Sequence, residues 1–235
     1  MNVLIVGGSG GIGLALVRVF CDANEVRGVT ATYRTVQPGL SHHKLNWEPL
    51  DVTNENEVAR LFEDCPDLTY IINAAGILHS AAGTPEKAIS KLDADFFMDN
   101  IRVNTLSTLL IAKYARRALK KAERSVLAVL SARVGSISDN HLGGWYSYRC
   151  SKAALNMAVK TLSIECARTL PNCAIVALHP GTVTTDLSAP FTRQRPGSGL
   201  FTPEQSAHWL ADIIMRLEPA DTGKFIAYDG SQVQW

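Results

Sequence analysis

The fold of this chain is decided by the stretch Val3-Leu4-Ile5-Val6-Gly7-Gly8-Ser9-Gly10-Gly11-Ile12-Gly13. Its apolar run is typical of a buried strand, and the residues from Ile12 to Phe20 have the spacing of an amphipathic helix. A glycine turn between strand and helix binds pyrophosphate, because the backbone comes close and the helix presents its positive end. Glycine-rich segments also occur in ordinary loops, so the flanking elements carry the prediction. Dinucleotide contacts are expected at Gly7, Ser9, Gly10, Gly11, Ile12 and Gly13.

Composition favours one domain, residues 1–235, with a small-molecule partner. A net charge of +1 with 19% charged residues provides no strong field for nucleic acid. No apolar run approaches the roughly 20 residues that span a bilayer, and the first strand starts too early for a leader peptide. The five cysteines lack C-x-x-C spacing, which favours free thiols. These features predict a cytoplasmic protein without a metal site, nucleic-acid partner or membrane insertion.

Short β-rich runs alternate with longer helical patterns along the chain. This alternation predicts an α/β fold in which helices cover both faces of a parallel sheet. The predicted strands are Val3–Val6, Gly28–Tyr33, Lys44–Leu50, Thr69–Asn73, Ser125–Ser131, Cys173–His179 and Lys224–Tyr228. Helices are predicted at about 11–23, 54–64, 93–122, 147–169 and 203–217. The irregular stretch 186–202 is interpreted as a substrate lid.

The second predicted strand ends at Tyr33-Arg34, about 20 residues beyond the glycine turn. An NAD-dependent enzyme carries an acidic residue there, for the ribose 2′-hydroxyl. Arg34 can instead bind a 2′-phosphate, which favours NADP(H) and keeps NAD(H) as the alternative. An exposed surface arginine is the competing interpretation. Asp51-Val52 follows the third strand and could bind adenine, although Asp51 could equally cap the helix that starts near Asn54.

Two further turns follow predicted strands at the carboxyl edge of the sheet, where ligands of such sheets bind. Small residues after the fourth strand allow backbone to approach a cofactor ribose, although a tight turn alone would explain them. The turn after the sixth strand combines proline, glycine and hydroxyl groups, which could bind the nicotinamide carboxamide and the pyrophosphate. The candidate residues are Asn73, Ala74, Ala75 and Gly76 in the first turn, and Pro180, Gly181, Val183 and Thr185 in the second.

Tyr148 and Lys152 form the sharpest chemical signal, because residues four apart on a helix lie on one face. Tyr146 has no such partner, since position 150 is a cysteine. A nearby ammonium favours phenolate, so Lys152 can tune Tyr148 as an acid or base and can also bind the nicotinamide ribose. In isolation such a pair is usually a surface feature. The preceding dinucleotide turn makes the catalytic interpretation the stronger one.

In order and spacing, these motifs, together with Asn104 in R-V-N-T, resemble the short-chain dehydrogenase/reductase family over essentially the whole chain. Residues 131–140, 143–148 and 228–235 look like the subgroup of the C-factor signalling protein and sniffer-type carbonyl reductases. The resemblance implies a doubly wound, seven-stranded Rossmann fold and hydride transfer between nicotinamide and a carbonyl or alcohol. It also implies Tyr148 as general acid/base, Lys152 as its partner, and Asn104 supporting a proton-relay water.

One departure from the family pattern concerns the serine that orients the substrate. It normally stands three residues before a glycine, and counting back from Gly135 reaches Ala132. Ser131 is one residue away and should point to the other side of the strand. Ser136 and Ser138 could substitute only through unusual geometry. Loss of such a donor typically costs about 10²–10³ in rate.

The favoured interpretation is therefore an NADP(H)-dependent oxidoreductase acting on a small carbonyl or alcohol substrate. Its rival is a nucleotide-binding regulatory or signalling protein with weak or no turnover, which Ala132 motivates. Substrate contacts are expected from segments 77–92 and 133–147 and from the lid. Apolar helix faces could pair subunits, but the sequence does not distinguish monomer from oligomer. The lid residues considered for the pocket are Leu187, Phe191, Leu200 and Phe201, with Arg193 and Arg195 either binding an anionic substrate or simply solvated.

Overall fold

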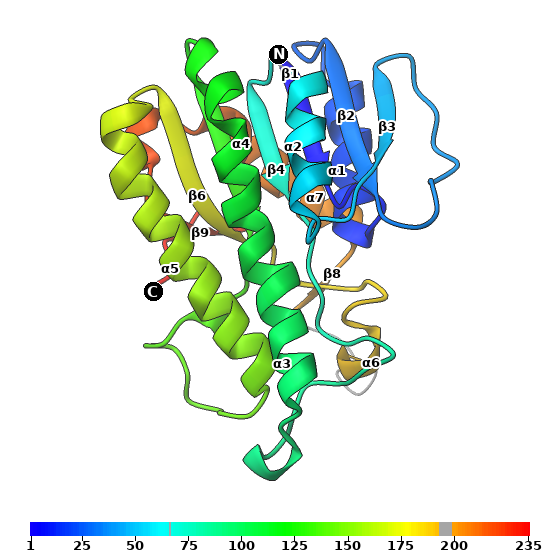
Figure 1. Ribbon diagram of the computed structural model, residues 1–235, viewed down its shortest axis with the longest axis vertical. Helices are drawn as coiled ribbons and strands as arrows, with labels where there is room; N and C mark the ends of the chain where they lie inside the picture. Colours follow the sequence, from blue (N-terminus) through cyan, green and yellow to red (C-terminus); the bar gives the residue numbers. More distant parts are fainter. Residues whose placement is uncertain (66, 193–198) are drawn as a thin grey trace.

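Seven parallel strands form one sheet in the computed structural model, which describes residues 1–65, 67–192 and 199–235. Their order across the sheet is β3-β2-β1-β4-β5-β6-β9, as in the doubly wound fold that was predicted (Figure 1). The order reverses between β1 and β4, the position where such sheets bind ligands. Each strand lies within one residue of its predicted range: β1 (Asn2–Val6), β2 (Gly28–Tyr33), β3 (Leu45–Pro49), β4 (Tyr70–Asn73), β5 (Ser125–Leu130), β6 (Cys173–His179) and β9 (Phe225–Ala227).

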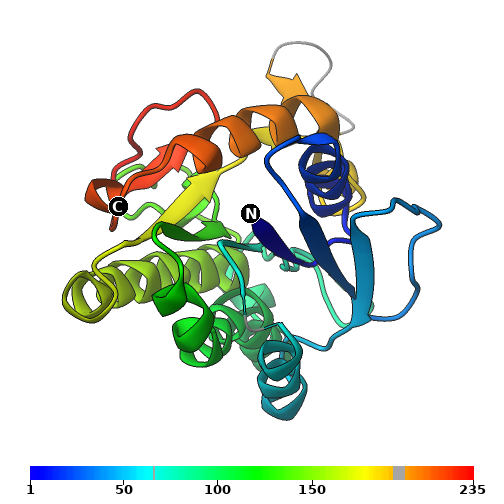
Figure 2. The same ribbon diagram turned by 90° about the horizontal axis from the view of Figure 1, so that it is seen from above.

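Helices cover both faces of this sheet. Seen from above, α1 (Gly11–Asp22) and α7 (Pro203–Arg216) lie on one side (Figure 2). The other side is covered by α2 (Glu55–Asp64), α4 (Ser107–Lys121) and α5 (Tyr146–Thr169). Successive side chains of a strand point to opposite faces, so β1 contributes to two separate cores. Val3 and Ile5 pack in the core on the α1 side, whereas Leu4 and Val6 pack in the core on the α5 side.

The single helix predicted over 93–122 is interrupted. It consists of α3 (Ala94–Ile101), a π-helical turn over Arg102–Leu106, and α4. Such a turn places one extra residue in the helix and often marks a functional position. Asn104 lies within it and is buried, so the interruption directs this side chain into the protein.

The predicted lid is partly regular. Residues Ala189–Thr192 form the short helix α6, and β8 (Leu200–Phe201) pairs in parallel with β7 (Thr182–Val183). The lid is therefore tied to the turn that follows β6. Arg193 and Arg195 lie outside the described residues, and closure of the segment over a substrate stays a prediction.

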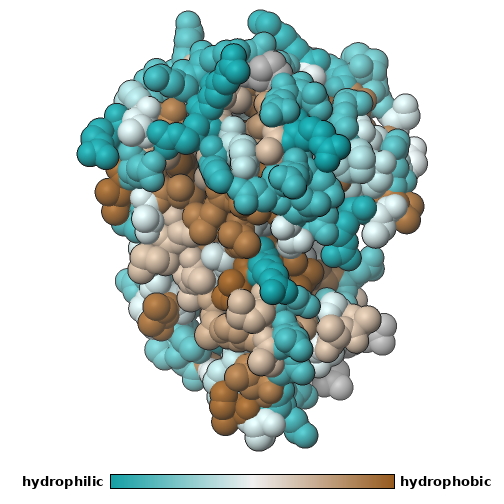
Figure 3. Space-filling view, in the orientation of Figure 1, coloured by the Kyte–Doolittle hydropathy of each residue, from teal (hydrophilic) through white to brown (hydrophobic). Residues whose placement is uncertain are grey.

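Apolar side chains gather on the surface over α3, α4 and α5 (Figure 3). The exposed members are Met98, Leu106, Leu109, Met157 and Ile164. Pairing of subunits through these helices stays a prediction. Among the described residues, no helix combines the length and the apolar character needed to cross a bilayer.

The glycine turn should tolerate no side chain at Gly13, because a Cβ there would lie 2.1 Å from the Gly7 carbonyl oxygen. We expect Gly13→Ala to lower the free energy of unfolding by about 1–3 kcal/mol, as overpacked sites do. Gly28→Ala is the matched control, since its Cβ would meet only the Asn2 side-chain oxygen at 3.5 Å. Urea unfolding measures both variants. Equal unfolding midpoints would contradict the close packing assigned to Gly13.

Candidate active site

The glycine turn lies in contact with two other turns at the carboxyl edge of the sheet. Gly7 has a φ of +77°, and a Cβ there would lie 2.7 Å from the Ala75 nitrogen. A Cβ at Gly11 would lie 2.6 Å from the Thr185 methyl carbon. Gly10, the residue before α1, provides no side-chain cap for the helix. This arrangement is a backbone cradle of the kind that a pyrophosphate needs.

A cavity of about 220 Å³ opens beside this cradle. It brings together predicted residues from the glycine turn and from the ends of β2, β3 and β4: Gly7, Ser9, Gly10, Tyr33, Arg34, Asp51, Val52, Ala74, Ala75 and Gly76. The remaining lining residues, Thr32, Leu50, Ile77 and Val103, were not predicted as cofactor contacts, although Ile77 begins the segment 77–92 that was expected to contact the substrate. Gly11, Ile12 and Gly13 begin α1 behind the turn, where Gly13 is buried and Ile12 is partly buried.

Arg34 and Asp51 lie together at the rim of the cavity. Arg34 is exposed and forms no ion pair with another described residue, which leaves its guanidinium available to a phosphate. The Thr53 hydroxyl donates to Asp51 at 2.7 Å and, together with the nearby charge of Arg34, holds the pKa of Asp51 below its usual value. The alternative prediction, that Asp51 caps the following helix, is wrong. The cap of α2 is Asn54, whose side chain accepts from the amides of Asn56 and Glu57.

Asn73 supports the turn after β4 from behind. Its amide nitrogen donates to the Thr108 hydroxyl at 2.8 Å, and its oxygen accepts from the Ala75 amide at 3.1 Å. The side chain does not line the cavity. Asn73 thereby shapes the segment whose backbone, at Ala74 to Gly76, faces the cavity. Direct contact between Asn73 and a cofactor stays a prediction.

The turn after β6 is built on an aromatic cluster. Gly181 has a φ of +81°, and a Cβ there would lie 2.7 Å from the Phe201 ring. Pro180 accepts a hydrogen bond from Ser206 at 2.8 Å, and Val183 is buried. Thr185 lies against the glycine turn, because a Cβ at Gly11 would meet its side chain at 2.6 Å. Contacts of this turn with the nicotinamide and pyrophosphate stay predictions.

Asn104 ties three elements together. Its oxygen accepts from the Ile77 amide at 2.8 Å. Its nitrogen lies within hydrogen-bond distance of the Ile77 carbonyl at 2.9 Å, Asn100 at 3.2 Å and the Ser151 hydroxyl at 2.9 Å. Ser151 belongs to α5, and Ile77 lines the cavity. The π-helical turn therefore fixes α5 against the segment that follows Gly76.

Tyr148 and Lys152 lie one turn apart on α5, as predicted. The Lys152 ammonium lies 5.8 Å from the centre of the Tyr148 ring and donates to the Leu130 carbonyl at 2.9 Å. Burial lowers the pKa of Lys152 to about 8 and raises that of Tyr148 above its usual range. A Cβ at Gly76 would lie 3.6 Å from the Lys152 nitrogen and 3.1 Å from the Asn104 oxygen. Lys152 and Asn104 thus lie beside Gly76, which lines the cavity, and Tyr148 lies next to Lys152.

A family model described as short chain dehydrogenase matches residues 1–196. The chain belongs to this family. A 1-hydroxy-2-glutathionyl-2-methyl-3-butene dehydrogenase from Rhodococcus sp. (strain AD45) is 33% identical over 100% of this chain and 99% of that protein. The C-signal protein of Myxococcus xanthus is 32% identical over 63% of this chain and 84% of that protein.

Solved structures of carbonyl reductases share the fold and the length of this chain. The NADPH-bound carbonyl reductase from chicken fatty liver has a TM-score of 0.88 at 26% identity, covering 100% of this chain and 94% of that one. The carbonyl reductase Sniffer of D. melanogaster has a TM-score of 0.87 at 26% identity, covering 100% and 99%. This short-chain dehydrogenase is therefore an NAD(P)-dependent oxidoreductase of the C-factor and sniffer-like subgroup.

The serines next to Ala132 in this short-chain dehydrogenase are engaged with other described residues. Ser131 is buried and its hydroxyl donates to the Asn156 side chain at 2.6 Å, so this hydroxyl is already engaged. That Ser131 points away from the substrate stays a prediction. Ser136 and Ser138 lie 3.3 Å apart, and Ser138 also donates to the Trp235 carbonyl. Ala132 precedes a 3₁₀ turn over Arg133–Gly135, which packs against Lys152.

Aromatic side chains gather beside Tyr148. The rings of Trp145 and Tyr148 are 6.3 Å apart, and Phe191 of the predicted lid lies 5.2 Å from Trp145 and 5.9 Å from His79. Trp145 was not singled out in the sequence, although its position just before the Tyr-Lys helix was a usable signal. Phe201 does not belong here, because it packs against Trp209 and Tyr228.

Histidines do not form a metal centre in the part of the chain that is described, where no three potential ligands cluster. His79 faces the Asp186 carbonyl and Phe191, and His141 is exposed. His179 lies beside Tyr228, and burial lowers its pKa to about 4, so its ring is neutral at pH 7.

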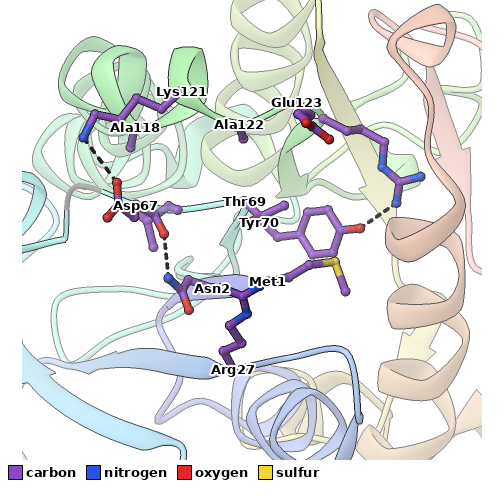
Figure 4. A pocket seen from close by; sticks show the side chains of 12 residues that line it. Met1, Asn2, Arg27, Asp67, Thr69, Tyr70, Ala118, Lys121, Ala122 and Glu123 are labelled. Carbon is purple, nitrogen blue, oxygen red and sulfur yellow. Dashed lines mark hydrogen bonds and ion pairs between the residues drawn. The ribbon is translucent and has the colours of Figure 1, made fainter.

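A larger hollow of about 460 Å³ lies at the opposite, amino end of the strands (Figure 4). Arg124 donates to the Tyr70 hydroxyl there at 2.6 Å, and Lys121 lies 3.2 Å from the Asp67 carboxylate. Asn2 donates to the Asp67 carbonyl at 2.9 Å. These polar groups bind one another, and ligands of doubly wound sheets bind at the carboxyl ends. The smaller cavity is therefore the candidate site.

Proposed function

We propose that this protein is an NADP(H)-dependent reductase of small carbonyl compounds, which also catalyses the reverse oxidation of the alcohol. The supporting observation is that Gly76 lines the candidate cofactor cavity and directly neighbours Lys152 and Asn104. Because Lys152 shares a helix face with Tyr148, an acid–base pair lies where the cofactor cavity ends. A nucleotide-binding protein without catalytic activity has no use for a buried lysine in that place.

Cofactor and substrate chemistry follow from the residues around this pair. The glycine cradle and Arg34 would hold the dinucleotide, which when bound supplies hydride to the substrate carbon or accepts it. Tyr148 would donate a proton to the substrate oxygen, and its raised pKa keeps the phenol protonated for this role. In the oxidation direction the Lys152 ammonium favours the phenolate. Lys152 would exchange protons with solvent through a water supported by Asn104.

The substrate is proposed to have an apolar body next to its carbonyl group. Trp145 and Phe191 present aromatic faces beside Tyr148, and apolar walls with few polar groups are typical of small-molecule sites. The similarity to carbonyl reductases supports a carbonyl substrate, and the Rhodococcus relative supports the corresponding alcohol.

The protein is proposed to act in the cytoplasm and to pair with a second subunit. All five cysteines are free, which is consistent with a reducing, cytoplasmic compartment. The exposed apolar side chains of α4 and α5, including Met157 and Ile164, provide a surface on which two subunits could pair.

The decisive experiment compares wild type with Tyr148→Phe in an assay of NADPH oxidation against a panel of carbonyl compounds. We expect kcat to fall by about 10²-fold or more, because the phenol is the proton donor. Tyr146→Phe is the matched control, since Tyr146 begins the same helix without a lysine four residues later. It should retain activity.

Ala132→Ser separates the enzyme from the regulatory alternative that Ala132 favours. Wild-type turnover that Ala132→Ser increases would support the proposed reductase. Tight NADPH binding by the wild type without turnover, combined with turnover by Ala132→Ser, would overturn it and identify a nucleotide-binding regulatory protein.

Arg34→Asp tests the cofactor preference. Removing a charge-assisted contact to the 2′-phosphate should shift the ratio of kcat/KM for NADPH and NADH by about tenfold or more towards NADH. Arg27→Asp makes the same charge change at the amino end of the strands and should leave the ratio unchanged. An unaltered ratio in Arg34→Asp would refute the role of Arg34.

The Lys152 ammonium also sets a pH limit for carbonyl reduction. Burial lowers its pKa from 10.5 to about 8, so the charged form is present below pH 8 and is lost above it. We therefore expect kcat/KM, which reports the free enzyme, to fall above about pH 8. Lys152→Arg should lower the absolute rate, because a guanidinium cannot exchange the proton, but it should also remove this falling limb from the profile of the remaining activity, because a guanidinium stays charged. A limb that persists in Lys152→Arg would show that another group controls it.

A further inference from the structure

Glu86 is a buried carboxylate that the proposed reaction does not use. It lies between β4 and α3 and is only 3% exposed. It forms no ion pair with any residue in the described ranges. A carboxylate without water or a cation is costly to bury unless hydrogen bonds satisfy it. Its partners should therefore explain why it is there.

Those partners lie at the start of α5. The Glu86 carboxylate accepts a hydrogen bond from the Ser147 amide at 3.0 Å and a second one from the Ser147 hydroxyl. Its main-chain carbonyl accepts from the Trp145 amide at 2.5 Å. One residue thus binds both ends of the tripeptide that immediately precedes Tyr148.

The start of α5 needs this outside support, because its own sequence provides none. Trp145 occupies the cap position in the left-handed conformation, with a φ of +52°, and makes no side-chain cap. Gly143 and Gly144 before it also have positive φ values. The first amides of a helix lack partners within the helix, and its positive end favours an anion. Glu86 supplies both the acceptor and the charge from a position 61 residues away in sequence.

We propose that Glu86 is a positioning residue that fixes the first turn of α5 and thereby the Tyr148 phenol and the Trp145 ring. The inference rests on the proposed function of Tyr148. Asn104 holds the next turn of the same helix through Ser151, so the two contacts clamp the segment that carries Tyr148. Catalytic geometry is sensitive to this support, since a displacement of about 1 Å can cost about 10²-fold in rate.

The test measures steady-state kinetics and NADPH affinity for Glu86→Ala, Glu86→Gln and Glu86→Asp. Glu86→Ala should lower kcat by about tenfold or more. The affinity for NADPH should stay within about twofold, because Glu86 does not line the cofactor cavity. Glu86→Gln should restore kcat to within about threefold, since its amide keeps an acceptor for the Ser147 N–H. Glu86→Asp keeps the carboxylate but shortens the side chain by one methylene group. Its kcat should therefore lie between those of Glu86→Gln and Glu86→Ala.

Asp93→Ala is the matched control for a merely structural effect. Asp93 caps α3 by accepting from the Phe96 amide at 2.8 Å, so its loss removes a carboxylate cap from a helix that packs against α5. We expect it to lower the unfolding temperature without lowering kcat. Equal losses of kcat in Asp93→Ala and Glu86→Ala, or a kcat of Glu86→Ala within twofold of wild type, would overturn the positioning role.

Hydrogen–deuterium exchange of residues 146–149 tests the contact without any turnover. Exchange in Glu86→Ala should become faster there and stay unchanged in the second half of α5. Unchanged exchange at 146–149 would overturn the proposal even for an active enzyme. Absence of turnover in the wild type would instead overturn the proposed function, so the two failures are distinguishable. If Glu86→Ala does not fold, Glu86→Asp carries both measurements.

Discussion

The glycine turn lies directly against two neighbouring turns at the carboxyl edge of the sheet, and the site depends on this close approach. The turn after β1 touches the turn after β4 at Gly7 and Ala75, and it touches the turn after β6 at Gly11 and Thr185. Side chains at the glycines would separate these turns. Their absence keeps Gly7, Gly10 and Gly76 together in the lining of the cavity, and it lets Gly76 lie beside Lys152 and Asn104. One wall therefore serves both cofactor binding and proton transfer.

Burial acts in opposite directions on the two members of the acid–base pair. It favours the neutral form of each, which lowers the pKa of Lys152 and raises that of Tyr148. A phenol that stays protonated is suited to donating a proton to a carbonyl oxygen. An ammonium that titrates near neutral pH can release and recover a proton during turnover. The hydrogen bond to the Leu130 carbonyl holds the Lys152 side chain in this buried position next to Tyr148.

Local sequence patterns were sufficient for most of the fold, because apolar runs and polar breaks report burial directly. They located every strand of the main sheet and the start of α5 within one residue. The π-helical turn at Asn104 could not be predicted, since it depends on Ile77 and Ser151, which are distant in sequence. Phe201 was assigned to the pocket for a similar reason, because its partners Trp209 and Tyr228 come together only in the folded chain.

The alanine at position 132 changes what the remaining groups must do. Ser131 donates to the Asn156 side-chain oxygen, so rotating it towards a substrate would leave that oxygen without this partner, in addition to the Asn156 side-chain nitrogen, which has none among the described residues. Tyr148 then has to polarise the carbonyl as well as protonate it. A missing donor matters least for a carbonyl that is already electron-poor, because such a carbon needs less help to accept hydride. In the proposed reaction, precise placement of Tyr148 then matters more, which gives the contacts of Glu86 and Asn104 with α5 their proposed importance.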